Sequence, residues 1–456
     1  MSSAGITFGG LASGLDTKAI IAALMAVERQ PITALEDKKT ELTKEKGLFG
    51  DLGGLLDTLR TAAQRLAHTT DFLTMKATAS DTLLSATATQ TAHAGTHDVV
   101  VQSLAAAQIS RSNGFASKDA AIISGGGTIF LNGSAMPVEI PANSSLQGVA
   151  DAINAADQDV TADIVDTGAP GNERYNLVLR SKTTGSAGGF TLVNDSGPTA
   201  TDLQALVDGI NSHTVVAASD AHVTIDGIDI TRTSNSIDDA IPGVTLDLHA
   251  ADATKHVTVT VGTDAEDTSK NVQAFVDAYN KVVDFIADQN ALDANGKAKN
   301  PLFGDSTLRS IRSSLRSIVG GSVATGDDAY AMFAQVGITS DRDGRLTFDS
   351  GKFTQALAGD EQAVTNLFAD AAHGIAARLD TQIGVYTDSV DGLIKARSDG
   401  YTRTIQDTQD RIDQGNERLT RYEAQLQERY ANLETLLGQL QSQGASLSSL
   451  GKTGGQ

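Results

Sequence analysis

The stretch that decides the fold is residues 405–447, IQDTQDRIDQGNERLTRYEAQLQERYANLETLLGQLQSQGASL. An aliphatic side chain stands at every seventh position, namely Ile405, Ile412, Leu419, Leu426, Leu433, Leu440 and Leu447. A straight α-helix drifts only about 20° per heptad, so these side chains form one nearly straight row. Burying each of them is favourable by about 1.5–3 kcal/mol, which is too much to leave in water. The pattern predicts a long helix that lies against a partner surface.

The second heptad row of this stretch is thin. It holds Tyr422, Leu436 and Leu450 and is interrupted by Gly415 and Gln443. A leucine zipper needs two good rows, whereas one row indicates a helix lying along another element. Packing within the chain and contact with other subunits both remain open, and both can hold for one helix.

The N-terminal part repeats the helical pattern. After a glycine-punctuated start (1–15), Asp16 or Thr17 can cap a helix, which Pro31 is expected to end or restart. Two heptad rows follow, Leu35, Leu42, Phe49 and Leu56, and Leu52, Leu59, Leu66 and Leu73.

Residues 77–262 show strand-like alternation with turn signals such as Asn132-Gly133 and Asp226-Gly227. We expect strand hairpins at 82–101 and 223–261, which lack partners unless they pair across an inserted part. Helical periodicity returns at 272–286 and 308–318, and a further hairpin is expected around Asp341–Gly344. We expect the helix over 42–66 to pack on these two later helices.

The predicted fold class is a multidomain α+β protein, with helical, coiled-coil terminal segments enclosing a β-rich head of two nested subdomains. The ranges are 1–34 for a flexible N-terminal leg segment, 35–76 plus 263–395 for a helical leg domain with a small hairpin, 77–111 plus 216–262 for one β-rich head domain, 112–215 for a second head domain inserted into it, and 396–456 for a C-terminal coiled-coil leg segment.

Composition excludes several classes of function. The 456 residues include no cysteine, which excludes disulfide scaffolds, thiol catalysis and cysteine-ligated metals. The net charge of −21 argues against nucleic acid as a partner. Residues 77–262 carry 7 basic and 20 acidic side chains, which predicts a well-solvated middle. No apolar run is long enough to insert in a membrane. Because no ordinary secretory signal is present, composition alone favours the cytoplasm.

Catalytic and metal-binding patterns are missing from the sequence. His93 and His97 are spaced for one helical face, but their context predicts a strand. The stretch Asp341–Gly344 begins like a calcium loop without its later ligands, so a turn is favoured. The glycine-rich stretches at 125–127 and 185–189 lack phosphate-binding signatures. We therefore expect no enzyme, no metal site and no cofactor.

The order of several motifs resembles a known family, the flagellar filament cap proteins, also called flagellar hook-associated protein 2. The N-terminal motifs are Ile6–Asp16, Ile20-Ile21 and Gln30-Pro31-Ile32. Residues 129–133, 145–146, 152–154 and 177–185 are similar to a repeat shared by flagellins and hook proteins. Residues 235–246, 275–280, 302–309 and 336–349 continue in the family's order.

The resemblance implies a non-catalytic, extracellular protein at the flagellar tip, exported by the flagellar type III system, which replaces the cytoplasmic expectation. The implied partners are other copies in a ring, commonly a pentamer, flagellin, the hook-filament junction protein and a flagellar export chaperone. The cap would promote flagellin polymerisation and prevent loss of unpolymerised flagellin. The alternative is a surface adhesin whose β-rich head binds host glycans. Candidate oligomer or filament contacts are Leu11, Leu15, Ile20, Ile21, Leu24 and Val27, together with the seven-membered row from Ile405 to Leu447.

Overall fold

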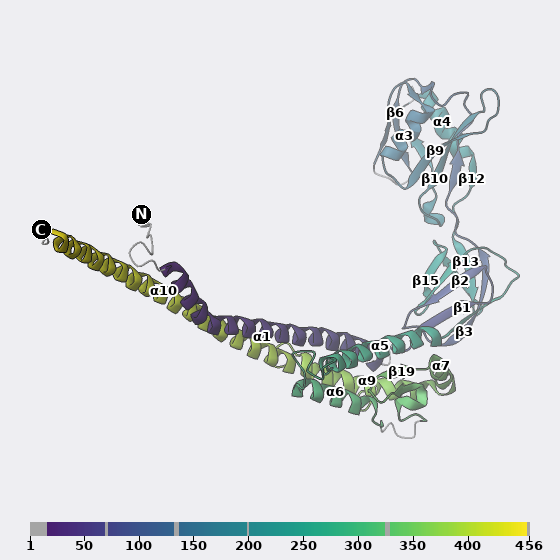
Figure 1. The fold of residues 1–456 in the computed structure, drawn as a ribbon. Helices are drawn as coiled ribbons and strands as arrows, with labels where there is room; N and C mark the ends of the chain where they lie inside the picture. The colour runs from purple at the N-terminus through teal and green to yellow at the C-terminus, as the bar shows by residue number, and fades with distance from the viewer. Residues whose placement is uncertain (1–15, 69–71, 132–135, 198–199, 324–328, 454–456) are drawn as a thin grey trace. The chain divides into compact units, whose positions relative to one another are not determined.

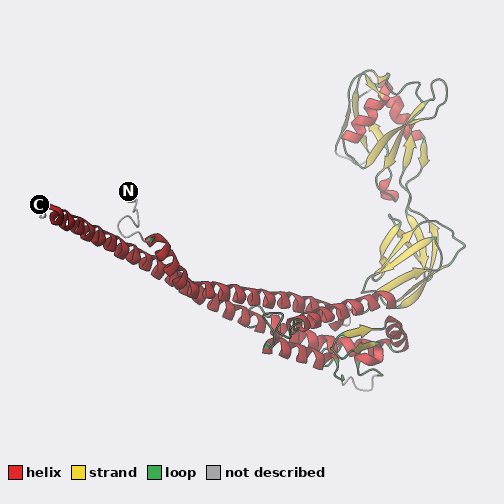
Figure 2. Ribbon diagram, viewed as in Figure 1, coloured by secondary structure: helices red, strands yellow, loops and turns green. Residues whose placement is uncertain are grey.

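The computed structural model describes residues 16–68, 72–131, 136–197, 200–323 and 329–453. The chain divides into two compact units: unit 1 is Met1–Phe72 with Ser269–Gln456, and unit 2 is Leu73–Thr268. Long helices gather in unit 1 and most strands in unit 2 (Figure 2). The predicted α+β class with helical termini is confirmed.

Unit 1 is built around two long helices, α1 (Thr17–Ala67) and α10 (Leu393–Thr453), which lie side by side (Figure 1). The shorter helices of this unit are α5 (Ala265–Gln289), α6 (Ser306–Val319), α7 (Ser350–Gly359), α8 (Glu361–Ala369) and α9 (Ile375–Thr387). A hairpin of β18 (Ile338–Ser340) and β19 (Leu346–Phe348) completes it. Asp305 caps α6, because its Oδ1 accepts the Thr307 N–H at 2.7 Å.

Helix α1 runs through Pro31 without a break, so the expected end or restart there is wrong. Proline removes only one backbone donor and pushes on the preceding turn, which bends a helix that is held elsewhere by packing. Figure 1 shows the first turns of α1 at an angle to the rest. Residues 17–34, predicted as a flexible segment, form these turns, and their flexibility stays a prediction.

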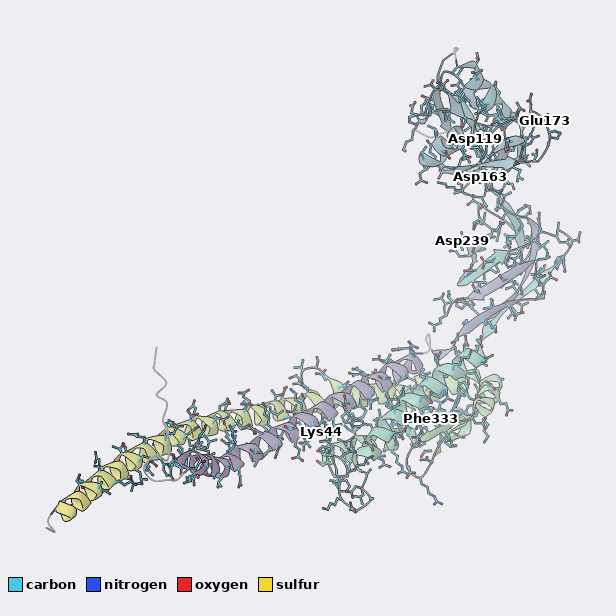
Figure 3. The ribbon with its side chains drawn as sticks, turned by 45° about the horizontal axis from the view of Figure 1, so that its top comes forward. Lys44, Asp119, Asp163, Glu173, Asp239 and Phe333 are labelled. Carbon is cyan, nitrogen blue, oxygen red and sulfur yellow. The ribbon has the colours of Figure 1, made fainter. Side chains whose placement is uncertain are left out.

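The buried face of α1 consists of the predicted rows, with no exposed surface at Phe49, Leu52, Leu56, Leu59 and Leu66. This face packs on α10 and α9, and on α8 near the end of α1. The expected packing on the helices at 272–286 and 308–318 stays a prediction, and the most extensive contacts of α1 are with α10 and α9. Helices α5 and α6 belong to the same unit. Phe275 of α5 packs in a cluster of phenylalanine rings with Phe333 and Phe368. Phe333 lies 6.0 Å from Phe275 and 4.8 Å from Phe368 between ring centroids (Figure 3).

Unit 2 contains one core formed by a five-stranded sheet, in the order β1-β17-β3-β13-β14, and a three-stranded sheet, β15-β16-β2. The first sheet comprises β1 (Met75–Ala79), β3 (Gly95–Ser103), β13 (Ala221–Ile225), β14 (Ile228–Arg232) and β17 (Val257–Thr263). The second comprises β2 (Leu84–Ala88), β15 (Ser236–Ile241) and β16 (Val244–Leu248). Strands before and after the insertion pair with one another, as predicted: β3 with β13 and β17, and β2 with β16. The expected hairpin over 82–101 is wrong, because β2 and β3 lie in different sheets.

The inserted part of unit 2 has its own core. Its main sheet has the order β12-β4-β10-β9, from β4 (Ile109–Arg111), β9 (Val160–Asp166), β10 (Tyr175–Ser181) and β12 (Thr214–Val216). The smaller strands are β5 (Ala121–Ile123), β6 (Gly127–Leu131), β7 (Val138–Ile140), β8 (Ser144–Ser145) and β11 (Leu192–Asn194). Helices α3 (Leu146–Ala155) and α4 (Thr201–Ser212) bury their apolar faces in this core. The turn expected at Asn132-Gly133 lies outside the described residues, although its flanking strands pair.

Acidic side chains of unit 2 lie at its surface. Asp119, Asp163 and Glu173 of the inserted part and Asp239 of β15 are exposed (Figure 3). Asp239 pairs with Arg232 at 2.9 Å, and the arginine lowers the pKa of this carboxyl. The acidic middle is therefore solvated, as its composition predicts.

Candidate assembly surface on the C-terminal helix

The described residues contain no group of three or more histidine, aspartate or glutamate side chains that could hold a metal ion. His97 instead pairs with Asp226 at 2.7 Å, and this bond lowers the pKa of Asp226. The Asp341–Gly344 stretch forms a hairpin turn, in which Asp341 Oδ1 accepts the Arg345 N–H at 2.9 Å. None of the described helices has an apolar stretch long enough to cross a membrane.

The heptad row on α10 divides into an inner and an outer half. Ile412, Leu419 and Leu426 keep only 5%, 9% and 6% of their surface exposed. Leu433, Leu440 and Leu447 expose 43%, 56% and 70%. Ile405 is half-buried. The inner half therefore packs within the chain, whereas none of the residues that the structure describes covers the outer half.

The inner half of the row is covered by α1. Ile32 forms a small buried cluster with Ile412 and Leu419, and Met25 and Leu35 pack against it. The candidates on the first turns of α1 are less buried. Ile20 and Ile21 are half-buried, Leu24 is 39% exposed and Val27 is 60% exposed. Leu11 and Leu15 lie outside the described residues.

The outer half of α10 presents an apolar stripe. We call the exposed side chains of Leu433, Leu436, Leu440 and Leu447 the outer α10 surface. At 100° per residue these four positions fall within an arc of about 60° on the helix. Leu436, 58% exposed, belongs to the second heptad row, so sequence reasoning identified it without placing it on this surface. An apolar stripe of this kind on a helix marks a contact with another protein surface.

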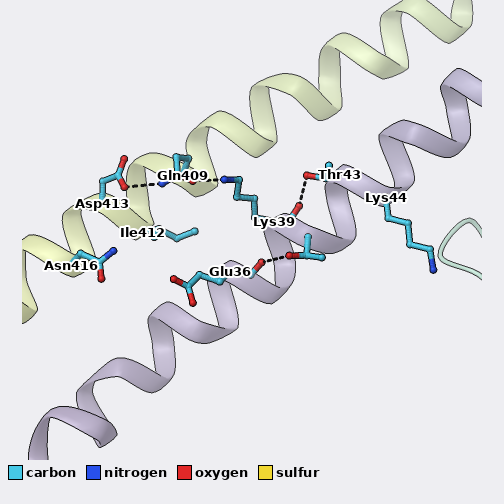
Figure 4. A pocket seen from close by; sticks show the side chains of 9 residues that line it. Glu36, Lys39, Thr43, Lys44, Gln409, Ile412, Asp413 and Asn416 are labelled. Atoms are coloured by element: carbon cyan, nitrogen blue, oxygen red, sulfur yellow. Dashed lines mark hydrogen bonds between the residues drawn. The ribbon is translucent and has the colours of Figure 1, made fainter. Parts of the chain in front are cut away.

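A groove of about 650 Å³ lies between the middle of α1 and α10 (Figure 4). Its floor includes Ile412, and Lys39 Nζ donates to Gln409 Oε1 across it at 2.5 Å. Gln409 Nε2 in turn donates to Asp413 Oδ1 at 2.7 Å. The complete lining is Glu36, Lys39, Thr40, Thr43, Lys44, Gln409, Ile412, Asp413 and Asn416.

Next to the Lys44 end of this groove, a junction of polar side chains joins α1, α6 and α10. Arg397 of α10 donates to Thr307 Oγ1 at 2.8 Å and to Asp305 Oδ2 at 3.2 Å. Burial raises the pKa of Glu45, and a hydrogen bond from Tyr401 partly offsets this. Burial and the neighbouring Glu45 raise the pKa of Tyr401 to about 12. The junction therefore places the half-buried Glu45 carboxyl group next to the Tyr401 phenol, which is neutral at neutral pH.

The fold and the α10 surface define a multidomain protein with a helical surface suited to assembly. The model of flagellar hook-associated protein 2 N-terminus matches residues 13–108, and that of its C-terminus matches residues 218–442. The flagellin hook IN motif matches residues 123–183. The chain belongs to the flagellar hook-associated protein 2 family, which confirms the resemblance.

Relatives and a solved structure agree with this assignment. The chain is 30% identical to flagellar hook-associated protein 2 of Escherichia coli (strain K12), over 95% of both chains. It is also 30% identical to A-type flagellar hook-associated protein 2 of Pseudomonas aeruginosa, again over 95% of both. The crystal structure of the D1-D2-D3 domains of the flagellar cap protein FliD from Escherichia coli is similar, with a TM-score of 0.58 at 30% identity, covering 78% of this chain and 99% of that chain.

Proposed function

We propose that this protein caps the distal tip of a bacterial flagellar filament, where it promotes flagellin polymerisation and prevents the loss of unpolymerised flagellin. The observation that carries the proposal is the outer α10 surface, in a chain whose relatives include a flagellar cap protein. An apolar stripe that none of the described residues covers is expected to contact another protein surface. The role is structural and requires no catalysis.

Copies of the chain assemble into a ring, which in this proposal has the five subunits common in the family. The outer α10 surface and the exposed side chains at the start of α1, Leu24 and Val27, contact neighbouring copies or flagellin. The match to a flagellin hook motif supports flagellin as a partner class. The further proposed partners are the hook-filament junction protein and an export chaperone, with release through the flagellar type III system.

Deletion of the gene in its own bacterium tests this function. Cells without the protein should release monomeric flagellin into the medium and show few filaments by electron microscopy, and the wild-type chain supplied in trans should restore both. Normal filaments with lost attachment to host glycans would favour the adhesin alternative, which the comparisons do not support. Normal filaments with normal attachment would contradict both.

A further inference from the structure

The loop between α5 and α6, residues 290–305, is long but internally fixed. Asp293 Oδ1 accepts the backbone N–H groups of Asn295 at 2.8 Å and Lys297 at 2.9 Å. Backbone bonds join Asp293 and Lys297 in the other direction, and Gly296 takes the positive φ of 73° that the turn requires. Asn300 Nδ2 donates to Asp288 O at 2.7 Å. Connections longer than about 12–15 residues are uncommon in compact domains and usually serve a function.

This fixed loop presents two large apolar side chains to solvent. Leu292 is 55% exposed and Phe303 is 44% exposed. We call these two residues the loop anchor. Burying exposed apolar side chains is favourable, and a loop whose backbone is already fixed loses little further conformational entropy on docking.

The groove between α1 and α10 has the size and position to receive such an anchor. Its volume of about 650 Å³ lies in the range of binding pockets, which is about 300–1,000 Å³. All of its lining residues come from α1 and α10, so the loop of the same copy does not fill it. Glu36 on its rim has no ion-pair partner among the residues that the structure describes, and the same holds for Lys297 in the loop.

The loop and the groove also lie at neighbouring levels along the long helices. Asp305, the last residue of the loop, is bonded to Arg397 of α10 and lies near Glu45 of α1. The groove extends from Glu36 to Lys44 of the same helix, which is about 12 Å at 1.5 Å per residue. In the ring proposed here the axis runs along the long helices, so rotation about it keeps every residue at its own level. A closed ring therefore needs an anchor and a receptor at similar levels on different faces of each copy.

We propose that the α5–α6 loop of one copy docks into the α1–α10 groove of the next copy in the ring, with Leu292 and Phe303 covered and Lys297 facing Glu36. This inference rests on the ring assembly proposed above. The contact is heterologous, so each copy uses its loop on one side and its groove on the other.

Cysteine cross-linking tests the contact directly, because the chain contains no cysteine of its own. Lys297→Cys and Glu36→Cys are placed in separate copies with different tags, expressed together in the deletion strain, and oxidised on sheared flagella. A disulfide-linked band that carries both tags is expected. Ser313→Cys on the exposed face of α6, paired with Glu36→Cys, is the control that should not cross-link. Filaments that grow normally while neither pair cross-links would overturn the docking.

Removing the loop anchor tests its energetic role. The double change Leu292→Ser and Phe303→Ser should weaken self-association of the purified chain, measured by sedimentation, by roughly tenfold or more. Val390→Ser is the matched control, because Val390 is 77% exposed in the same unit but lies outside the loop. Equal association of the double variant and the wild type would overturn the inference.

A charge exchange covers the case in which the double variant does not fold. Lys297→Glu should impair filament growth, and Glu36→Lys in the same chain should restore it, because every loop then again meets an opposite charge. Failure of the exchange to restore growth, at normal export, would contradict the contact. Wild-type chain that does not restore filaments to the deletion strain would instead contradict the proposed function, so the two failures are distinguishable.

Discussion

Ile32 on α1 packs directly over Gly415 on α10. A Cβ atom at Gly415 would lie 2.8 Å from Ile32 Cγ1 and 3.0 Å from Cδ1, and Ile32 is only 5% exposed. In the sequence, Gly415 is seen only as an interruption of the second heptad row. The structure shows that its missing side chain is the space into which α1 packs, one residue after Pro31.

Gly415→Ala tests this close approach. Alanine favours a helix interior over glycine by about 1 kcal/mol, but an added Cβ forces Ile32 to move, and overpacking typically costs about 1–3 kcal/mol. We expect no gain, or a loss of about 1–2 kcal/mol, in the free energy of unfolding of unit 1, measured by thermal or denaturant unfolding with circular dichroism.

Gly400→Ala is the matched control, because no atom lies within 4 Å of a Cβ at that position of the same helix. It should stabilise the protein by about 0.5–1 kcal/mol. Equal stabilisation by both substitutions would show that Ile32 does not fix this crossing.

The division of the heptad row predicts different outcomes for two aspartate substitutions. Leu426→Asp places a carboxylate at a position that is 6% exposed, so unit 1 should lose several kcal/mol of stability and capping should fail. Leu433→Asp changes a position that is 43% exposed, so the unfolding free energy should shift by less than about 0.5 kcal/mol. Unit 2 should be unaffected in both.

Capping should nevertheless fail in the Leu433→Asp cells, with flagellin in the medium and few filaments. Asn432→Asp adds the same charge at the adjacent exposed position without removing an apolar side chain, and it should swim normally. Full-length filaments in the Leu433→Asp strain, at normal export, would exclude the outer α10 surface as the working contact.

The sequence patterns predict elements better than partners. Heptad spacing identifies the buried face of α1, from Phe49 to Leu66. The same spacing does not tell which helices cover that face, and it gives no sign that α9, with Leu379 and Ile383 buried, contacts α1. Apolar faces are interchangeable in composition, so their pairing depends on the tertiary arrangement.

In the strands, too, the sequence pattern identifies buried faces but not the sheet to which a strand belongs. Alternation places Leu84 and Val99 on buried faces, yet it does not show that they belong to different sheets.

Along α10, every leucine of the row has the same local pattern. Which of them are buried depends on how far α1 extends, and this length is not encoded in the row itself.

Glu45 makes the stability of unit 1 depend on pH. Its pKa is raised in the folded chain, so its favourable contribution is fully present below the unfolded value and is lost as the pH rises through the folded value. Glu45→Gln should therefore raise the melting temperature at pH 7 relative to the wild type, and this difference should disappear near pH 4. The glutamine amide oxygen still accepts the Tyr401 hydroxyl.

The melting temperature of Glu45→Gln is compared with that of the wild type at each pH, because other carboxyl groups change the stability with pH in the opposite direction. Backbone N–H groups lower the pKa of Asp370 and Asp388, so their contribution is lost as the pH falls. Asp51→Asn, an exposed change on the same helix, is the control. A Glu45→Gln effect that does not change between pH 4 and pH 7 would contradict the assigned cause.

The inserted part of unit 2 has a core of its own, and its division from the rest as a separate domain stays a prediction. Its buried cluster includes residues between Ile123 and Ile210 only, and the surrounding cluster includes none of them. Strand β4 lies outside the predicted range 112–215 of the inserted domain, yet it pairs with β10 and β12 of that domain. The chain enters and leaves at Ala106 and Ser219, which exchange backbone hydrogen bonds at 2.8 and 3.2 Å.

Replacing residues 108–217 with a two-glycine linker should therefore close a short turn and leave the outer core folded. None of the buried residues of that core is removed, so its cooperative unfolding and its resistance to proteolysis should persist, and the shortened chain should still be exported. The predicted range 112–215 would leave β4 without β10, so a deletion of 112–215 should be less stable than that of 108–217. Global unfolding of the 108–217 deletion, with loss of the strand signal in circular dichroism, would show that the two cores of unit 2 depend on each other.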